Sequence, residues 1–181
     1  MTITVRTLAI GVTLFVVATV GGVVLLLHGG AQEAAAARLS LGVPVVVSPD
    51  RIGSLTGSAT PIYWAGAFPQ TRLEVTTTKT GSFVRYLPPS APVGTKSRTL
   101  TIATYAVPNA WRVALRAARE QGAHRASLPD GQLAVWRAGR PTSVYLARRG
   151  SSTLVEVFDP DAARARHLSL SGLVQPVPTA R

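Results

Sequence analysis

The sequence predicts an α+β protein: an N-terminal transmembrane helix followed by one domain built on an antiparallel sheet. The first observation behind this prediction is an apolar segment, residues 8–27, that contains no charged residue. The second is a series of short alternating segments separated by Gly- and Pro-containing turns, which is typical of strands joined by hairpins. The third is that few segments have helical spacing. We therefore expect two or three helices packed on one face of the sheet.

The apolar segment is long enough to cross a bilayer. Its 20 residues would span about 30 Å as a helix, which is the thickness of the hydrocarbon core. The apolar region of a signal peptide is shorter, about 7 to 15 residues. We expect a retained anchor, with cleavage near the small residues 29–31 or 34–37 as the alternative. Long C-terminal domains usually translocate, so the domain is expected outside the cytoplasm, although its positive charge favours the cytoplasmic face.

The chain is predicted to have five parts. At 181 residues it has room for one ordinary domain. Hydrophobic residues make up 46% of the sequence and charged residues 15%, which indicates a packed core rather than disorder. The parts are a short N-terminal tail (1–7), the transmembrane helix or uncleaved signal anchor (8–28), a stalk or linker (29–44), the α+β domain (45–176) and a C-terminal tail (177–181).

The beginning of the domain is predicted to contain short elements. Segment 41–47 is typical of a linker or of an edge strand interrupted by Pro44. Residues 48–50, Ser-Pro-Asp, have the layout of a helix start, and predict a short helix to about Leu55. Segment 61–66 predicts a brief strand.

A hairpin and a third strand follow. Segment 72–87 alternates on both sides of a turn at Thr80 and Gly81, as the two strands of a hairpin do. Segment 99–107 predicts another strand. The Pro-, Gly- and Ser-containing segment 88–98 between them predicts a mobile loop.

The clearest helix is predicted between Pro108 and Gly122. Its apolar stripe follows the spacing i, i+3, i+4 and i+7. A second helix is predicted to begin after Asp159-Pro160-Asp161 and to end near Gly172. Three short strands are expected between the helices, at 132–138, 142–149 and 153–159. The stripe of the first helix consists of Trp111, Ala114, Leu115 and Ala118.

The order strand–strand–helix occurs twice, around residues 83–121 and 144–172. This recurrence predicts a pseudo-duplicated domain. The residues of the two segments hardly match, so the chain is not expected to be a repeat protein.

The basic charge predicts an anionic partner. The net charge is +11, and the chain after residue 38 keeps 17 basic and 7 acidic residues. Such an excess attracts phosphate, carboxylate or anionic lipid, and arginine suits bidentate contacts with oxyanions. The alternative is a solvated surface that reflects an Arg-rich, GC-rich genome. The candidate anion-binding residues are Arg112, Arg116, Arg119, Arg137, Arg148 and Arg149.

Several chemistries find no support in the sequence. The absence of cysteine excludes disulfides, thiol catalysis and Cys-based metal sites. No P-loop, dinucleotide fingerprint, HExxH or GxSxG motif occurs, so no catalytic residue, cofactor or metal is predicted. Nucleic acid is not expected as a partner. An envelope hydrolase remains the alternative, with a Ser/His site or a carboxylate pair. Its candidates are His124 and His167, and Glu74, Asp130, Glu156, Asp159 and Asp161.

Several short motifs add a resemblance. They are PIYWAG, SFVRYLPP, TYAVPNA, RPTSVYLA, VEVFDP and SGLVQP. Together they resemble uncharacterised membrane-anchored, extracytoplasmic proteins of GC-rich, actinomycete-type bacteria, and the resemblance covers most of residues 61–176. It implies a single extracytoplasmic domain, without an activity or a ligand. We expect a single-pass envelope protein whose domain is a non-catalytic binding module, with anionic lipid or cell-wall polymer as candidate ligands.

Overall fold

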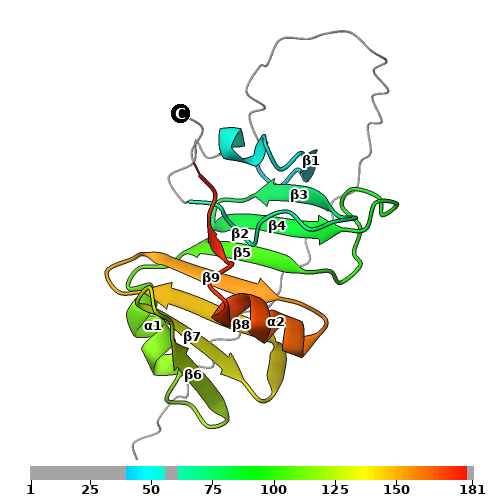
Figure 1. Ribbon diagram of the computed structural model, residues 1–181. Coiled ribbons are helices and arrows are strands. Elements are labelled where there is room, and N and C mark those ends of the chain that lie inside the picture. Colours follow the sequence, from blue (N-terminus) through cyan, green and yellow to red (C-terminus); the bar gives the residue numbers. More distant parts are fainter. Residues whose placement is uncertain (1–39, 56–60, 179–181) are drawn as a thin grey trace, which may run out of the picture. The chain divides into compact units, whose positions relative to one another are not determined.

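The computed structural model describes residues 40–55 and 61–178, and within these ranges the chain forms mostly antiparallel sheet with two α-helices (Figure 1). The predicted α+β class is therefore confirmed. The described residues all belong to one compact unit. The predicted membrane span lies outside them. None of the helices within them is long and apolar enough to cross a membrane.

The large sheet has eight strands, and every neighbouring pair is antiparallel. The two central strands come from the two halves of the domain, so the sheet joins both halves into one core. A second sheet pairs β2 (Tyr63–Trp64) with β10 (Gln175–Pro176). In spatial order the eight strands are β1 (Val45–Val47), β3 (Arg72–Thr77), β4 (Gly81–Leu87), β5 (Thr101–Ala106), β9 (Thr153–Phe158), β8 (Arg140–Arg148), β7 (Gln132–Arg137) and β6 (Ala123–Ser127).

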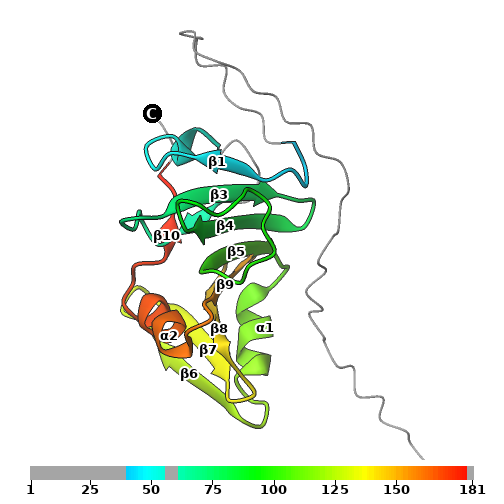
Figure 2. The ribbon, with the colours of Figure 1, turned by 90° about the vertical axis from the view of Figure 1, so that its right-hand side faces the viewer.

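The helices α1 (Ala110–Ala117) and α2 (Ala162–Leu170) lie on opposite faces of the sheet (Figure 2). The prediction that the helices pack on one face is therefore wrong. Alternate residues of the same strands pack against different helices. The cluster under α1 contains Ala110, Ala114, Leu133, Val135 and Ala147, whereas the cluster under α2 contains Ala165, Leu168, Ala134, Val144, Leu146, Val155 and Val157.

The composition of β7 explains why each face of the sheet carries a helix. In β7 the apolar run continues through Leu133, Ala134 and Val135, so both faces of this strand are apolar. A strand with two apolar faces must be covered on both sides. One helix can cover only one face, and each helix therefore packs on its own side of the same strands.

The order of elements in the two halves is alike, but their packing is not. The meander β3–β4–β5 is followed by α1, and the meander β7–β8–β9 is followed by α2. However, α1 contacts β7, β8 and β9, and α2 contacts β8 and β9. Helices on opposite faces are incompatible with a two-fold axis perpendicular to the sheet, so the likeness of the halves is limited to the order of their strands.

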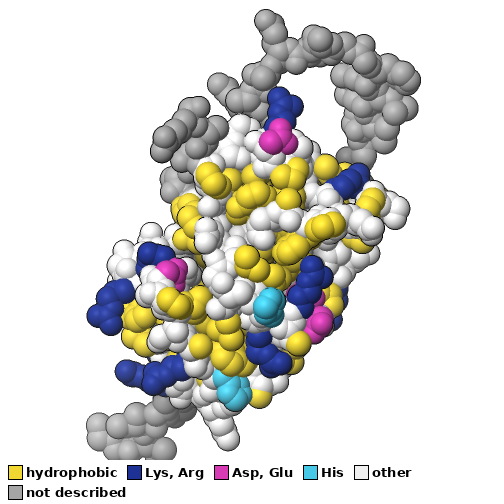
Figure 3. All heavy atoms as spheres, in the orientation of Figure 1, with side chains coloured by type: hydrophobic (Ala, Val, Ile, Leu, Met, Phe, Trp, Pro, Cys, Tyr) yellow, Lys and Arg dark blue, Asp and Glu magenta, His cyan; other side chains and the backbone are white. Residues whose placement is uncertain are grey.

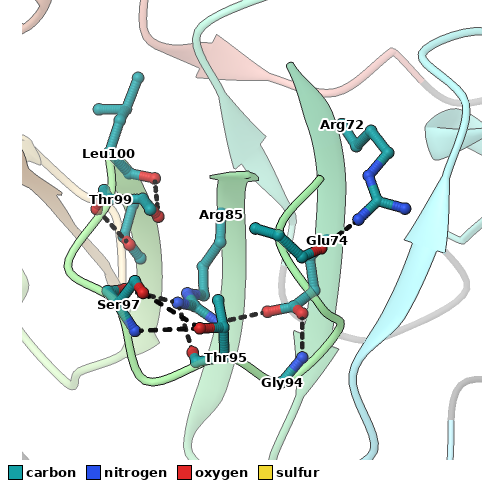
Figure 4. Close-up of polar contacts among 10 residues, drawn as sticks. Arg72, Glu74, Arg85, Gly94, Thr95, Ser97, Thr99 and Leu100 are labelled. Atoms are coloured by element: carbon teal, nitrogen blue, oxygen red, sulfur yellow. Dashed lines mark hydrogen bonds and ion pairs between the residues drawn. The ribbon is translucent and has the colours of Figure 1, made fainter. Parts of the chain in front are cut away.

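A loop takes the place of a helix over β3 and β4. The side chains of Glu74 and Arg85 lie on the α1 side of these strands and form an ion pair of 2.6 Å. Glu74 Oε2 also accepts the amide of Gly94 at 2.6 Å. Arg85 donates to the carbonyl oxygens of Thr95 at 2.8 Å and Ser97 at 2.9 Å (Figure 4). These bonds hold the predicted loop 88–98 on the sheet, and we call them the loop latch.

Three short elements depart from the sequence analysis. The predicted helix ending near Leu55 is a 3-10 turn, Ile52–Leu55. Strand β6 has the polar sequence AHRAS, which lacks an apolar alternation, and it forms because it pairs with β7 at an edge of the sheet. Strand β10 has only two residues and is defined by its pairing with β2. Both strands depend on a partner that a local pattern does not reveal.

Candidate anion-binding site

The outer side of α1 carries arginines. The predicted apolar stripe of this helix faces the sheet, with Ala114 buried and Trp111 and Leu115 half-buried. The opposite side is consequently exposed to solvent, as helical periodicity requires. Arg112 and Arg116 lie on this exposed side, one turn apart, and Arg119 follows in the turn after the helix.

A fourth arginine joins this group from the other half of the domain. Arg149 lies in the turn between β8 and β9, and its guanidinium carbon lies 5.3 Å from the centre of the Trp111 ring. The face of an indole ring attracts a cation at this distance. The stacking therefore places the charge of Arg149 beside the first turn of α1, next to Arg112.

The other two predicted arginines have acidic partners. Arg137 forms an ion pair with Glu120 at 2.6 Å, and Arg148 forms one with Asp130 at 2.7 Å. All four side chains are about half exposed, so each pair contributes little to stability. Each acid nevertheless neutralises the arginine beside it. The six candidates thus divide into two paired residues and four that make no ion pair within the described part of the chain, namely Arg112, Arg116, Arg119 and Arg149.

A hollow of about 300 Å³ lies at the start of α1. Asn109 precedes the helix in a left-handed conformation, with φ 56°, and its side chain makes no capping hydrogen bond. The first amides of a helix have no intrahelical acceptor and carry a partial positive charge. A tetrahedral oxyanion in this hollow would meet amide, hydroxyl and guanidinium donors. The lining residues are Asn109, Trp111, Arg112, Gly150, Ser151 and Ser152.

The face of the molecule that carries α2 has a different character. Its basic side chains are interspersed with hydrophobic, acidic and histidine side chains (Figure 3). One of these arginines, Arg164, contacts Asp159 at 3.5 Å and lies over the ring of Phe68. Arg164 on α2 thus has an acidic partner, whereas the arginines of α1 form no ion pair among the described residues.

The two buried glutamates do not form a carboxylate pair. Glu74 is in β3 and Glu156 in β9, and strands β4 and β5 lie between them. At about 4.8 Å per strand this separates the two backbones by roughly 14 Å, which exceeds the spacing of a glycosidase pair. Glu74 belongs to the loop latch. The carboxylate pair of the hydrolase alternative is therefore not assembled from these two residues.

Glu156 is held by two tyrosines. The hydroxyl of Tyr105 donates to Oε2 at 3.0 Å, and the hydroxyl of Tyr145 donates to Oε1 at 3.2 Å. Burial and then the neighbouring carboxylate raise the pKa of both tyrosines. Both phenols therefore keep their protons and remain donors, which satisfies a carboxylate that is only 7% exposed.

The remaining titratable candidates have local roles. Asp161 caps α2, since its side chain accepts the amides of Ala163 and Arg164, as the sequence predicts. His124 stacks on Trp136, with ring centres 5.6 Å apart. His167 lies exposed on α2. Within residues 40–55 and 61–178, no group of three or more His, Asp or Glu side chains is arranged to hold a metal ion.

Sequence reasoning finds the arginines of α1 but not the hollow or the Trp111–Arg149 contact. Both depend on the approach of the β8–β9 turn to the start of α1, residues about 40 apart in the chain. Comparisons with known proteins add no further constraint. No protein-family model matches this chain, and no match was found among curated proteins or solved structures.

Proposed function

We propose that this chain is a single-pass, membrane-anchored envelope protein whose extracytoplasmic domain is a non-catalytic module that binds phosphate-bearing anions. The anchor is the uncharged segment 8–27, which has the length of a bilayer span. The domain follows this segment and is translocated, as long C-terminal domains usually are. Anionic lipid headgroups and phosphate-bearing cell-wall polymers share the chemistry that such a module recognises.

This proposal rests on one observation: some of the candidate arginines form ion pairs with acidic residues, and the arginines around α1 do not. Arg112, Arg116, Arg119 and Arg149 surround the outer side of α1 without an acidic partner among the described residues. Guanidinium groups bind phosphate oxygens in a bidentate manner, and the amides at the start of α1 provide further donors. The hollow beside Arg112 has room for one phosphate group.

The test uses the full chain in nanodiscs of phosphatidylcholine, a zwitterionic lipid without net charge. The probes are inorganic polyphosphate and vesicles that contain phosphatidylglycerol, which separate a soluble polymer from a lipid headgroup as the ligand. The variant carries Arg112→Gln, Arg116→Gln and Arg119→Gln. At about 1 kcal/mol per charge, we expect it to bind roughly 100-fold more weakly at low salt, and its affinity should depend less on salt.

The matched control removes the same charge elsewhere, with Arg51→Gln, Arg98→Gln and Arg166→Gln. Arg51 directly precedes the 3-10 turn, Arg98 lies in the loop before β5, and Arg166 lies on α2, on the opposite face of the sheet from α1. We expect the control to keep most of the affinity, because only long-range attraction is lost. Equal losses in the two triple variants would contradict a site at α1 and would indicate attraction by net charge alone.

A further inference from the structure

We infer that one apolar corner of the domain is a membrane-contact surface, which rests on the proposed anchoring of the chain. The apolar corner consists of Leu41, Val43, Val46 and Val93. Their side chains are 62%, 49%, 40% and 48% exposed. Within the described residues only six large apolar side chains are this exposed, and four of them lie here.

The contacts of segment 41–46 and the β4–β5 loop bring these residues together. Val46 lies opposite Glu74 in the pairing of β1 with β3, so its side chain is on the face that the loop latch occupies. Glu74 accepts the amide of Gly94, the residue after Val93. A Cβ atom at Gly94 would lie 3.5 Å from the Pro44 ring. The two chain segments that carry the apolar corner therefore contact each other at Pro44 and Gly94, on the face that Val46 also occupies.

The loop latch fixes the shape of this surface. Glu74 is 1% exposed and accepts the amide of Gly94, and its ion-pair partner Arg85 donates to the carbonyl oxygens of Thr95 and Ser97, which follow Gly94 in the loop. The loop is therefore held on the sheet with Val93 exposed, rather than left free to bury its apolar residue. An apolar group that is held out in water by a buried ion pair calls for an external partner.

The charges around the corner fit an anionic bilayer. The chain has two lysines, Lys79 and Lys96, and both lie in turns or loops next to segments that form the corner. Lys96 follows Val93 in the loop. Lys79 lies in the β3–β4 turn beside Thr77, whose carbonyl accepts the amide of Gly42 at 2.7 Å. Lysine stems can lie along apolar surface while the ammonium groups reach lipid headgroups.

The short chain between the predicted anchor and the domain makes the bilayer the partner that we infer for the apolar corner. Eleven residues, 29–39, separate the predicted anchor from Ser40. Fully extended, they reach at most about 40 Å, and Leu41 follows directly. The corner thus stays close to the membrane in which the same chain is anchored. Helix α1 packs on β7, β8 and β9, four to six strands from β1, or roughly 19 to 29 Å away. Its arginines remain free for a ligand beyond the headgroups that the corner meets.

The test exploits the absence of cysteine from the chain, which leaves a single introduced thiol as the only labelling site. Full-length Val93→Cys and Ala163→Cys are labelled with the fluorophore NBD and placed in nanodiscs of phosphatidylcholine and phosphatidylglycerol. Ala163 is an exposed residue of α2 and serves as the matched control. We expect the Val93→Cys label to show blue-shifted emission and quenching by lipids with a nitroxide on the acyl chain. The Ala163→Cys label should show neither.

A second variant guards against a label that enters lipid by itself. Adding Val43→Asp and Val46→Asp to Val93→Cys should abolish the quenching, because the charges oppose insertion of the corner. A chain that resists alkaline carbonate extraction, yet has an unquenched, water-like Val93→Cys label, would overturn the membrane contact and leave the anchoring intact. A chain released by carbonate would overturn the anchoring and this inference together.

Discussion

The two halves of the large sheet differ in how their α1-side faces are covered. Over β7, β8 and β9 lies a helix, with Ala110 and Ala114 packed on Leu133 and Val135. Over β3 and β4 lies a loop, held by the loop latch. Apolar packing is non-directional and spread over many atoms, whereas the latch concentrates its effect in one buried carboxylate and one guanidinium. Removing one residue of the loop latch should therefore release the whole loop from β3 and β4. Truncating one apolar residue under α1 should weaken the packing of the helix only in part.

The largest effect is expected from Arg85→Met. This change leaves the Glu74 carboxylate buried without its cation, which typically lowers the free energy of unfolding by about 3–5 kcal/mol. The carbonyl oxygens of Thr95 and Ser97 also lose their donor. Urea unfolding of the full chain in detergent, followed by tryptophan fluorescence, measures the loss. Hydrogen exchange should accelerate at residues 94–98.

The control for this variant replaces both partners, with Glu74→Leu and Arg85→Leu. Removing both charges avoids the buried uncompensated carboxylate, so most of the stability should return. The loop should still exchange rapidly, because Gly94 has lost its acceptor. Wild-type stability of Arg85→Met would show that the ion pair does not support this half.

A smaller effect is expected from Leu133→Ala in the helix half. Leu133 is 4% exposed, and its truncation should leave a cavity under α1 that costs about 2–4 kcal/mol. The loop latch is not touched, so exchange at residues 94–98 should stay as in the wild type. Leu170→Ala, at an exposed position, is the control and should change stability by less than about 0.5 kcal/mol. Faster hydrogen exchange at residues 94–98 in Leu133→Ala would mean that the stability of the latched loop depends on the packing of α1.

The smallest effect is expected at Tyr86 in β4. Its side chain lies on the α2 side of the sheet, opposite the loop latch. Burial raises the pKa of Tyr86 to about 12, and the residue is 3% exposed. Because the folded-state pKa lies above the unfolded value of 10.0, this contribution is complete below pH 10 and is lost as the pH rises toward 12. Two pH units correspond to about 2–3 kcal/mol. The Tyr86→Phe variant should therefore lose less of its free energy of unfolding between pH 10 and pH 12 than the wild type does.

Absorbance at 295 nm provides the measurement. The chain has four tyrosines, and the pKa is raised for each of them, Tyr63, Tyr86, Tyr105 and Tyr145. The native chain should therefore form little phenolate at pH 10, whereas the urea-unfolded chain should be about half ionised there. A native titration centred at pH 10 would contradict the burial of these hydroxyls.

Local patterns in the sequence were sufficient for the class of fold and for most elements. The alternation of 72–87 predicts β3 and β4, the apolar stripe from Trp111 predicts the buried side of α1, and Asp161 predicts the start of α2. Each of these depends on neighbours within a few residues, where period and capping act. The exposed arginines of α1 follow from the same periodicity.

The tertiary structure alone decided which strands meet and what covers each face. The pairing of β5 with β9 separates Glu74 from Glu156, and the approach of the β8–β9 turn brings Arg149 onto Trp111. Nothing local distinguishes an arginine paired with an acid, such as Arg137, from one that forms no ion pair among the described residues, such as Arg112. Charges and apolar faces act across space, so their partners depend on contacts between residues that are distant in the chain.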